Sequence, residues 1–330
     1  MNVLITGSGG FVGSHLVDEY VRRGHNVSVV IRNETTLRWI DSNKVSIYKG
    51  SYNDTTFLQN AIKNQDIIIH SAGVLASSDY VGFYEGNVEV TNNLLEAVLQ
   101  VNPTVKRFVH ISSLAVSLPS PSIEQPTTEE NSTQEPLTKY GKSKLEAEKV
   151  VHTFMDKIPI TIVRPPAIYG PRDEAIYDYF RLLSKGFIAP IMGFDNKRMS
   201  LIHVNDLVRG IYELCQTEKT ISQTYYLTSK EFYSWLDIIR ATKKALNKPF
   251  LVPIPLPHFI ILLNGYVSTF IGNIRKKPPV FDREKAKNFT QRHWICSHKK
   301  AVNDFQFEQQ ISLQEGIQQT MDWYKNNGWL

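Results

Sequence analysis

The chain of 330 residues is long enough for one large or two medium domains with a substantial core. Its hydrophobic content of 42% is ordinary for a globular protein, and its net charge of +5 is far from the balance of a nucleic-acid-binding protein. The two cysteines, Cys215 and Cys296, form no CxxC pair, so a disulfide scaffold and a metal site are not expected. The amino-terminal residues show no basic segment followed by a cleavable apolar one, and we therefore expect a cytoplasmic protein.

The first half of the chain alternates short apolar runs with amphipathic segments. Strands are predicted at residues 2–6, 26–31, 45–48, 66–70, 107–112 and 160–163. Helices are predicted between them at residues 10–23, 54–63, 86–99 and 137–152. Continuous β-branched runs separated by helices predict a parallel sheet that is covered on both faces, which is a doubly wound, Rossmann-type α/β domain.

Two stretches interrupt this alternation. Residues 117–138 are rich in Pro, Ser, Thr and Glu and too long for an ordinary connection, which predicts a surface loop beside a site. After Pro171 the pattern loosens into amphipathic helices and a proline-rich VPIPLP segment. We expect a Rossmann domain over residues 1–171, to which 199–228 return, and a smaller substrate-binding lobe made of 172–198 and 229–330.

The segment FIILLNGYVSTFI at residues 259–271 is the most apolar part of the second half. It is shorter than the roughly 20 residues that a membrane-spanning helix needs, so we expect no integral span. A basic run, Arg275-Lys276-Lys277, follows it. The segment is predicted to be a buried helix beside a solvated basic face, and the alternative is a helix that makes peripheral contact with an anionic membrane surface.

The stretch TGSGGFVG at residues 6–13 matches the pattern G-x-x-G-x-x-G on Gly7, Gly10 and Gly13. It lies between a predicted strand and a predicted helix. Without Cβ atoms the backbone can approach a pyrophosphate closely, and the helix dipole and free N–H groups stabilise its charge. Phe11 and Val12, at the start of the helix, complete this candidate cofactor-binding turn. The alternative is a tight turn with a close helix–strand contact.

The end of the second predicted strand bears on which cofactor would bind. NAD-binding domains usually carry an Asp or Glu there to hold the ribose 2′-hydroxyl. This chain instead has Ile31 followed by Arg32. An arginine can pair with a 2′-phosphate, which a carboxylate would repel, so the sequence favours NADP over NAD. A solvated arginine is the alternative.

Tyr140 and Lys144 are four residues apart on a predicted helix and therefore share a face. An ammonium beside a phenol favours the phenolate and lowers its pKa from about 10, which makes Tyr140 a candidate general acid/base. The predicted strand that ends in HISS (110–113) brings a serine hydroxyl to the carboxyl edge of the sheet. That hydroxyl could hydrogen-bond the same substrate oxygen.

These motifs, in this order, resemble the extended short-chain dehydrogenase/reductase superfamily, of the NAD(P)-dependent epimerase/dehydratase type. Further matching segments are HSAG (70–73), NVEVTNNLLEA (87–97), VKRFVHISS (105–113), VRPPAIYGPRD (163–173) and LIHVNDLVRGI (201–211). The resemblance runs nearly from end to end. It implies the fold and the nicotinamide cofactor, and it leaves the substrate open.

The resemblance also implies roles for matching positions. Tyr140 would be the acid/base, Lys144 would bind the nicotinamide ribose and tune Tyr140, and Ser113, or Ser112 as the alternative, would polarise the substrate oxygen. A homodimer through the helix that bears Tyr140 and its neighbour is implied as well.

Further contacts with the cofactor are implied along the strand ends. Ala72 and Gly73 would line the adenine–ribose side, and Pro165 to Ala167 would edge the nicotinamide. The family often has Gly-Asp after the third strand, with the Asp touching adenine, and Ser51 stands at that position here.

Residues near the serine strand end separate branches of the family. Leu114-Ala115 follow Ser113, where sugar-nucleotide dehydratases carry an Asp-Glu pair, so that elimination chemistry lacks its residues. The segments 30–33, 259–271 and 292–296 look more like the 3β-hydroxysteroid dehydrogenase and dihydroflavonol reductase branch. We predict hydride transfer between NADP(H) and a secondary alcohol or ketone of a small, fairly apolar, sterol- or flavonol-like substrate.

Two alternatives remain open. A nucleotide-sugar epimerase could use some of the nine Lys and Arg residues between Arg275 and Lys300 for diphosphate contacts. A non-catalytic, cofactor-sensing regulator could share the fold, although such proteins commonly lose the Tyr/Lys pair that this chain keeps.

Overall fold

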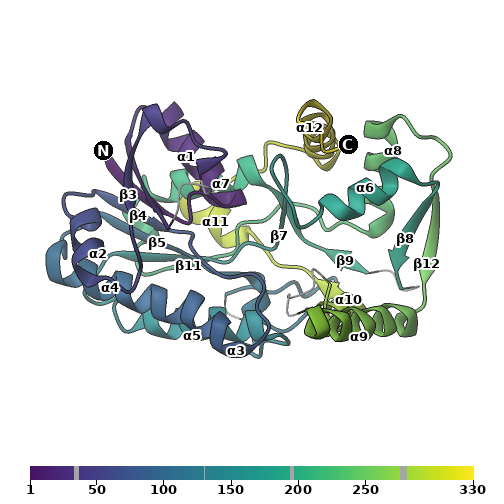
Figure 1. Cartoon of the computed structure of the whole chain (residues 1–330), viewed down its shortest axis with the longest axis horizontal. Helices are drawn as coiled ribbons and strands as arrows, with labels where there is room; N and C mark the ends of the chain where they lie inside the picture. Colours follow the sequence, from purple (N-terminus) through teal and green to yellow (C-terminus); the bar gives the residue numbers. More distant parts are fainter. Residues whose placement is uncertain (33–36, 130, 194–196, 276–280) are drawn as a thin grey trace.

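The computed structural model describes residues 1–32, 37–129, 131–193, 197–275 and 281–330. Two lobes lie side by side (Figure 1). The large lobe is built on a parallel sheet and holds most of the first half of the chain. The small lobe holds most of the second half and consists mainly of helices.

The large lobe is organised by a seven-stranded sheet in the order β11-β6-β5-β4-β1-β2-β3, with all neighbours parallel. Its strands are β1 (Asn2–Thr6), β2 (Asn26–Ile31), β3 (Val45–Lys49), β4 (Ile67–His70), β5 (Arg107–Ile111), β6 (Ile160–Val163) and β11 (Thr224–Tyr225). The order reverses between β1 and β4, because the chain builds outward to β3 and then returns to the other side of β1. This is the expected doubly wound fold, and its switch point lies between β1 and β4.

Helices cover both faces of the sheet (Figure 1). They are α1 (Phe11–Arg22) and α7 (Val204–Leu214) on one face, and α2 (Thr55–Ile62), α4 (Val90–Val101) and α5 (Lys139–His152) on the other. Val3 and Ile5 pack in the cluster that contains α1 and α7, whereas Leu4 packs with α2 and α4. All three are fully buried. A strand buried on both faces needs no polar positions, which explains the continuous apolar runs.

The small lobe has its own core. Its helices are α6 (Tyr177–Lys185), α8 (Trp235–Leu246), α9 (His258–Arg275), α10 (Arg283–Thr290) and α12 (Leu313–Asn326). Three two-stranded sheets join its segments, namely β7 (Ala167–Tyr169) with β10 (Leu201–His203), β8 (Ile188–Met192) with β12 (Val252–Leu256), and β9 (Arg198–Met199) with β13 (His293–Trp294). Phe180, Ile239, Met321 and Tyr324 are among the buried side chains that hold α6, α8 and α12 together.

Further helical segments connect these layers. Among them are the short α3 (Tyr80–Tyr84), the π-helical turn Glu85–Glu89 that continues it into α4, and α11 (Lys299–Phe305). The segment 117–138 reaches across to the small lobe rather than lying wholly on the surface. Ser120 and Thr127 are buried, and their backbone N–H groups donate to the carbonyls of His293 and Ile295 at 2.9 and 3.1 Å.

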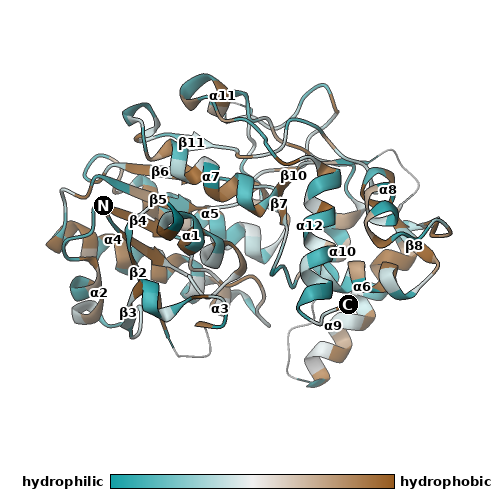
Figure 2. Cartoon of the chain, turned by 90° about the horizontal axis from the view of Figure 1, so that it is seen from above, coloured by the Kyte–Doolittle hydropathy of each residue, from teal (hydrophilic) through white to brown (hydrophobic). Residues whose placement is uncertain are grey.

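The prediction of a buried helix at residues 259–271 is wrong. Eight apolar side chains of α9 are exposed, namely Phe259, Ile260, Leu263, Tyr266, Val267, Phe270, Ile271 and Ile274. Figure 2 shows α9 at the outer edge of the small lobe, with hydrophobic segments in brown. Arg275 ends the helix, and Lys276 and Lys277 of the predicted basic run lie outside the described residues. Within the part of the chain that the structure describes, every helix is too short or too polar to cross a membrane.

Candidate functional site

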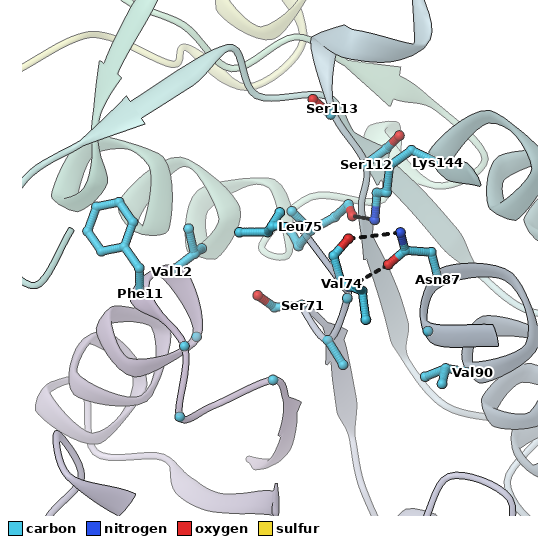
Figure 3. A pocket seen from close by; sticks show the side chains of 18 of the residues that line it. Phe11, Val12, Ser71, Val74, Leu75, Asn87, Val90, Ser112, Ser113 and Lys144 are labelled. Atoms are coloured by element: carbon cyan, nitrogen blue, oxygen red, sulfur yellow. Dashed lines mark hydrogen bonds between the residues drawn. The ribbon is translucent and has the colours of Figure 1, made fainter. Parts of the chain in front are cut away.

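A cavity of about 520 Å³ opens at the carboxyl ends of β1, β2, β4 and β5, at the switch point of the sheet (Figure 3). The register explains why the strand ends meet there. Thr6 pairs with His70 and His70 pairs with His110, so three adjacent strands end at nearly the same level, with β5 running one residue further to Ile111. The polypeptide that follows each strand therefore turns into the same crevice.

The glycine turn forms one wall of this cavity. Gly7 has φ +68°, and a Cβ atom on it would lie 2.6 Å from the backbone nitrogen of Ala72. A Cβ on Gly13 would lie 2.1 Å from the carbonyl oxygen of Gly7. Both positions therefore require glycine. Gly10, Phe11 and Val12 line the cavity beside them, and α1 begins at Phe11, which turns its first N–H groups toward the cavity.

The predicted adenine side of the cavity contains one residue that the sequence did not single out. This residue is Tyr52, which follows β3, is buried and lines the cavity. Arg32, which follows β2 and is exposed, lines the cavity as well. Burial raises the pKa of Tyr52 to about 12, and its interactions with Thr6, Gly7 and Arg32 lower it in part. The Ser51 hydroxyl instead accepts a hydrogen bond from the Asn53 N–H at 3.2 Å, which closes its own turn. Tyr52 could not be found from the sequence, because the family position points to its neighbour.

The loop after β4 is tied to the two helices that face it. Asn87 accepts a hydrogen bond from the Val74 N–H at 2.7 Å and donates to the Val74 carbonyl at 3.1 Å. Figure 3 shows this pair of hydrogen bonds between Asn87 and Val74. Asn87 also donates to the Ser143 hydroxyl of α5 at 2.8 Å. Ala72 and Gly73, immediately before Val74, line the cavity. Asn87 thus fixes this loop relative to α5.

Four residues from the serine strand end and the Tyr/Lys helix come together on the opposite wall, as the sequence predicts. Ser112, Ser113, Tyr140 and Lys144 all line the cavity. Ser113 accepts a hydrogen bond from the Ala115 N–H at 3.1 Å and so caps a short 3-10 turn. Ser112 is buried, and its hydroxyl has no hydrogen-bond partner among the described residues. A bound molecule could satisfy that hydroxyl.

The electrostatics of the Tyr/Lys pair differ from the sequence expectation. Lys144 donates to the carbonyl of Ile111 at 2.6 Å (Figure 3). Burial raises the pKa of Tyr140 to about 12, and the Ser113 hydroxyl lowers it in part. The predicted lowering of that pKa is therefore wrong, because burial outweighs the hydrogen bond with Ser113 and the Lys144 ammonium donates to the Ile111 carbonyl instead. Burial also lowers the pKa of Lys144 to about 8, although Glu148 raises it. At neutral pH the phenol keeps its proton and Lys144 remains mostly charged.

The remaining wall comes from the segment after β6. Pro165, Pro166, Ile168 and Asp173 line the cavity, whereas the side chain of Ala167 is exposed. Asp173 accepts hydrogen bonds from the N–H groups of the residues that start the next segment, the nearest at 2.8 Å. Its second oxygen is buried and has no hydrogen-bond partner in the described parts of the chain. Burial raises the pKa of Asp173 to about 7.

The arrangement as a whole suits a dinucleotide and a proton transfer. A phosphate-accommodating turn, an apolar and partly polar cavity and a tyrosine beside a lysine meet in one crevice. A model of the NAD dependent epimerase/dehydratase family matches residues 3–234. The chain belongs to this family. Its members are NAD-dependent enzymes of the extended short-chain dehydrogenase/reductase type.

Curated relatives cover the chain almost completely. A ceramide reductase of Caulobacter vibrioides is 27% identical over 99% of this chain and 96% of its own. A decarboxylating sterol-4-alpha-carboxylate 3-dehydrogenase of Candida albicans is 25% identical over 98% and 97%. A UDP-glucose 4-epimerase of Vibrio cholerae is 27% identical over 97% and 94%. Reductases, dehydrogenases and epimerases thus all occur at similar distance.

Solved structures show the same fold. UDP-glucuronic acid 4-epimerase from Bacillus cereus, in complex with UDP-glucuronic acid and NAD, superposes with a TM-score of 0.78 at 22% identity, over 99% of this chain and 100% of its own. UDP-glucose 4-epimerase from Thermotoga maritima gives a TM-score of 0.79 at 20% identity, over 99% of each chain.

Proposed function

We propose that this protein is an NADP(H)-dependent oxidoreductase that interconverts a secondary alcohol and a ketone on a small, fairly apolar, sterol- or flavonol-like substrate. The observation that carries the proposal is the meeting of Ser112, Ser113, Tyr140 and Lys144 in one cavity with the glycine turn. Relatives named for ceramide and sterol substrates support an apolar substrate class. The bound cofactor supplies or accepts the hydride.

Tyr140 is the proposed proton donor to the ketone oxygen. Burial keeps its pKa at about 12, so the phenol is protonated at neutral pH and ready to donate when an alcohol forms. Ser113 lies close enough to influence that pKa, and we assign it the hydrogen bond to the same substrate oxygen. The buried hydroxyl of Ser112 is the alternative for this contact.

The remaining site residues are proposed to hold the cofactor. Gly7, Gly10 and Gly13, with the first N–H groups of α1, would bind the pyrophosphate, since a Cβ at Gly7 or Gly13 would fill that space. Lys144 would bind the nicotinamide ribose. Ala72, Gly73 and Tyr52 would border the adenosine half, and Pro165 and Pro166 would border the nicotinamide, whereas Ser51 and Ala167 do not line the cavity.

We also propose that the two lobes bind different molecules, and that the protein is a cytoplasmic homodimer. Residues 1–171 with 199–228 would bind the cofactor, and 172–198 with 229–330 would bind the substrate. The dimer would form through α5 and the neighbouring α4, which share one outer layer of the large lobe. Light scattering of the purified protein tests this assembly, and a monomer at micromolar concentration would contradict it.

A nucleotide-sugar epimerase is the second candidate, supported by the UDP-glucose 4-epimerase relative. An epimerase returns the hydride to its own substrate and keeps its cofactor, whereas a dehydrogenase exchanges the cofactor after each turnover. The test is dialysis of protein loaded with NADPH, followed by fluorescence of the retained nucleotide. The proposal predicts loss of the nucleotide on dialysis together with net NADPH oxidation when an apolar ketone is added. Retention of the nucleotide, together with epimerisation of UDP-glucose by protein loaded with NADP⁺ and no net oxidation of NADPH, would replace the proposal by the epimerase.

A further inference from the structure

Helix α9 presents a continuous apolar face to solvent. We define the α9 stripe as Phe259, Leu263, Tyr266, Phe270 and Ile274. These side chains are between 56% and 67% exposed. Their spacing of four, three, four and four residues puts them within an arc of about 80° on a helix that turns 100° per residue. Large apolar residues normally occupy the inward face of a surface helix, so this helix is reversed relative to the usual pattern.

Packing against α10 fixes this orientation. A Cβ atom on Gly265 would lie 2.4 Å from the Cβ of Ala286, so the two helices touch at their smallest residues. Thr269 accepts a hydrogen bond from the N–H of Arg283 at 2.9 Å, and Ile261 is buried on the same side. Turning the stripe inward would force a Phe or Leu side chain into the position of Gly265. The outward stripe is therefore built into the lobe.

The charges around the stripe favour an anionic partner. Residues 258–275 contain no Asp or Glu. Arg275 at the end of α9, and Arg283 and Lys287 on α10, are exposed. The carboxylates of α10 are engaged elsewhere. Asp282 accepts a hydrogen bond from the Lys285 N–H at 2.7 Å, and Glu284 accepts one from the Lys139 N–H at 2.7 Å.

A second copy of the chain fits this surface less well than a lipid bilayer does. A two-fold interface pairs the same patch with itself, so the flanking cations Arg275, Arg283 and Lys287 of each copy would meet a helix α9 that offers no Asp or Glu to pair with them. A bilayer with anionic headgroups accepts the stripe among its acyl chains and pairs with the flanking cations. The segment that leads into α9 adds further exposed apolar side chains, at Phe250, Val252 and Ile254.

We infer that α9 docks the protein onto an anionic lipid surface, lying in the plane of the interface with the stripe inserted among the lipids. The helix acts as a peripheral anchor and does not cross the bilayer. Glu284 ties α10 to the first residue of α5, the helix that carries Tyr140, so the docked face adjoins the candidate active site. An apolar substrate delivered from the membrane, a consequence that rests on the proposed function, would enter beside it.

Co-sedimentation with vesicles tests this docking without any measurement of activity. The full chain is mixed with sucrose-loaded vesicles of phosphatidylglycerol and phosphatidylcholine, or of phosphatidylcholine alone. The wild type is expected to pellet with the anionic vesicles, and less with the neutral ones or at high salt. The double variant Leu263→Ser with Phe270→Ser should lower the partition coefficient at least about tenfold. The matched control, Ile47→Ser with Val101→Ser, removes two exposed apolar side chains of the large lobe and should bind as the wild type does.

Three results would overturn the inference. The wild type could stay in the supernatant with anionic vesicles, or the stripe variant could pellet as strongly as the wild type. Light scattering could also show a wild-type dimer that the stripe variant converts to a monomer, which would make a second copy the occupant. Melting temperatures check that the variants fold, and the pair Phe259→Ser with Tyr266→Ser repeats the test at two of the three remaining stripe positions should the first pair misfold.

Discussion

The central sheet of the large lobe and the outer edge of the small lobe use apolar residues in opposite ways. In the large lobe, the apolar residues of β1, β4 and β5 are buried between two layers of helices. In the small lobe, the strand β12 contains two prolines and is largely exposed, and α9 points its largest side chains toward solvent. Hydrophobicity therefore predicts burial only where the topology supplies a second layer to cover it.

The candidate site lies where the two lobes meet. The large lobe supplies Thr6, His70 and His110, which lie in one row at the carboxyl edge of the sheet. Thr6 and His70 are linked there by a hydrogen bond of 2.8 Å. The small lobe joins this frame at Asp173, whose carbonyl accepts a hydrogen bond from Tyr324 of α12 at 2.6 Å. A family with many substrates can keep the sheet edge of the large lobe constant while the loops and the small lobe vary.

Removing the phenol hydroxyl at this boundary has the largest expected effect. Tyr140→Phe should lower the turnover number about 10³-fold, because the proposed proton donor is lost, while the NADPH dissociation constant stays within about twofold. The checks are steady-state kinetics with an apolar ketone and a fluorescence titration with NADPH. Tyr48→Phe, on β3, is the control and should leave turnover unchanged. A similar turnover for Tyr140→Phe and the wild type would remove Tyr140 from the mechanism.

The contrast in burial can be tested with one leucine from each lobe. Leu94→Ala on α4 should lower the free energy of unfolding by about 3 kcal/mol, because the side chain is fully enclosed in the sheet–helix core. Leu263→Ala in the α9 stripe should change it by less than about 0.5 kcal/mol. Urea denaturation measures both. Equal losses would mean that α9 is covered in solution.

Asp173, where the two lobes meet, should make the free energy of unfolding depend on pH. Burial raises the pKa of Asp173 from 3.8 to about 7, so the folded protein holds a proton that the unfolded chain releases above about pH 4. The folded state binds more protons in this window, and this carboxyl therefore lowers stability as pH rises toward 7. Asp173→Asn should remove about 2 kcal/mol of the change in unfolding free energy between about pH 5 and pH 8. Parallel profiles for variant and wild type would refute this assignment.

Arg32 should give the smallest of these effects and the most selective one. Arg32→Ala should weaken NADPH binding about tenfold and leave NADH binding unchanged, since only NADPH carries the 2′-phosphate. Titration of cofactor-stripped protein by fluorescence measures both constants, and Arg22→Ala on α1 is the control. An equal loss for both nucleotides, or a wild type that prefers NADH, would contradict the choice of NADP.

The fold and most of the site could be predicted because local and global signals agree in the large lobe. The apolar runs of the strands, the spacing of the glycines and the spacing of Tyr140 and Lys144 can each be recognised from a short stretch of neighbouring residues. Tyr52 could not be predicted, because its approach to Thr6 depends on how the loop after β3 folds back. The pKa of Tyr140 could not be predicted either, because burial depends on the whole surrounding lobe. The orientation of α9 could not be predicted because it depends on contacts with a separate helix, such as that of Gly265 with Ala286 and that of Thr269 with Arg283.

The most direct measurement is net oxidation of NADPH by the purified wild type in the presence of a ketone-bearing sterol or ceramide-like lipid, followed by its loss of fluorescence. The proposed ketone reduction predicts that NADPH is consumed in a one-to-one ratio with the alcohol formed. It also predicts that Tyr140→Phe slows this consumption about 10³-fold. NADPH that binds but is never consumed by any apolar ketone, while UDP-sugars are epimerised, would contradict the proposed hydride transfer.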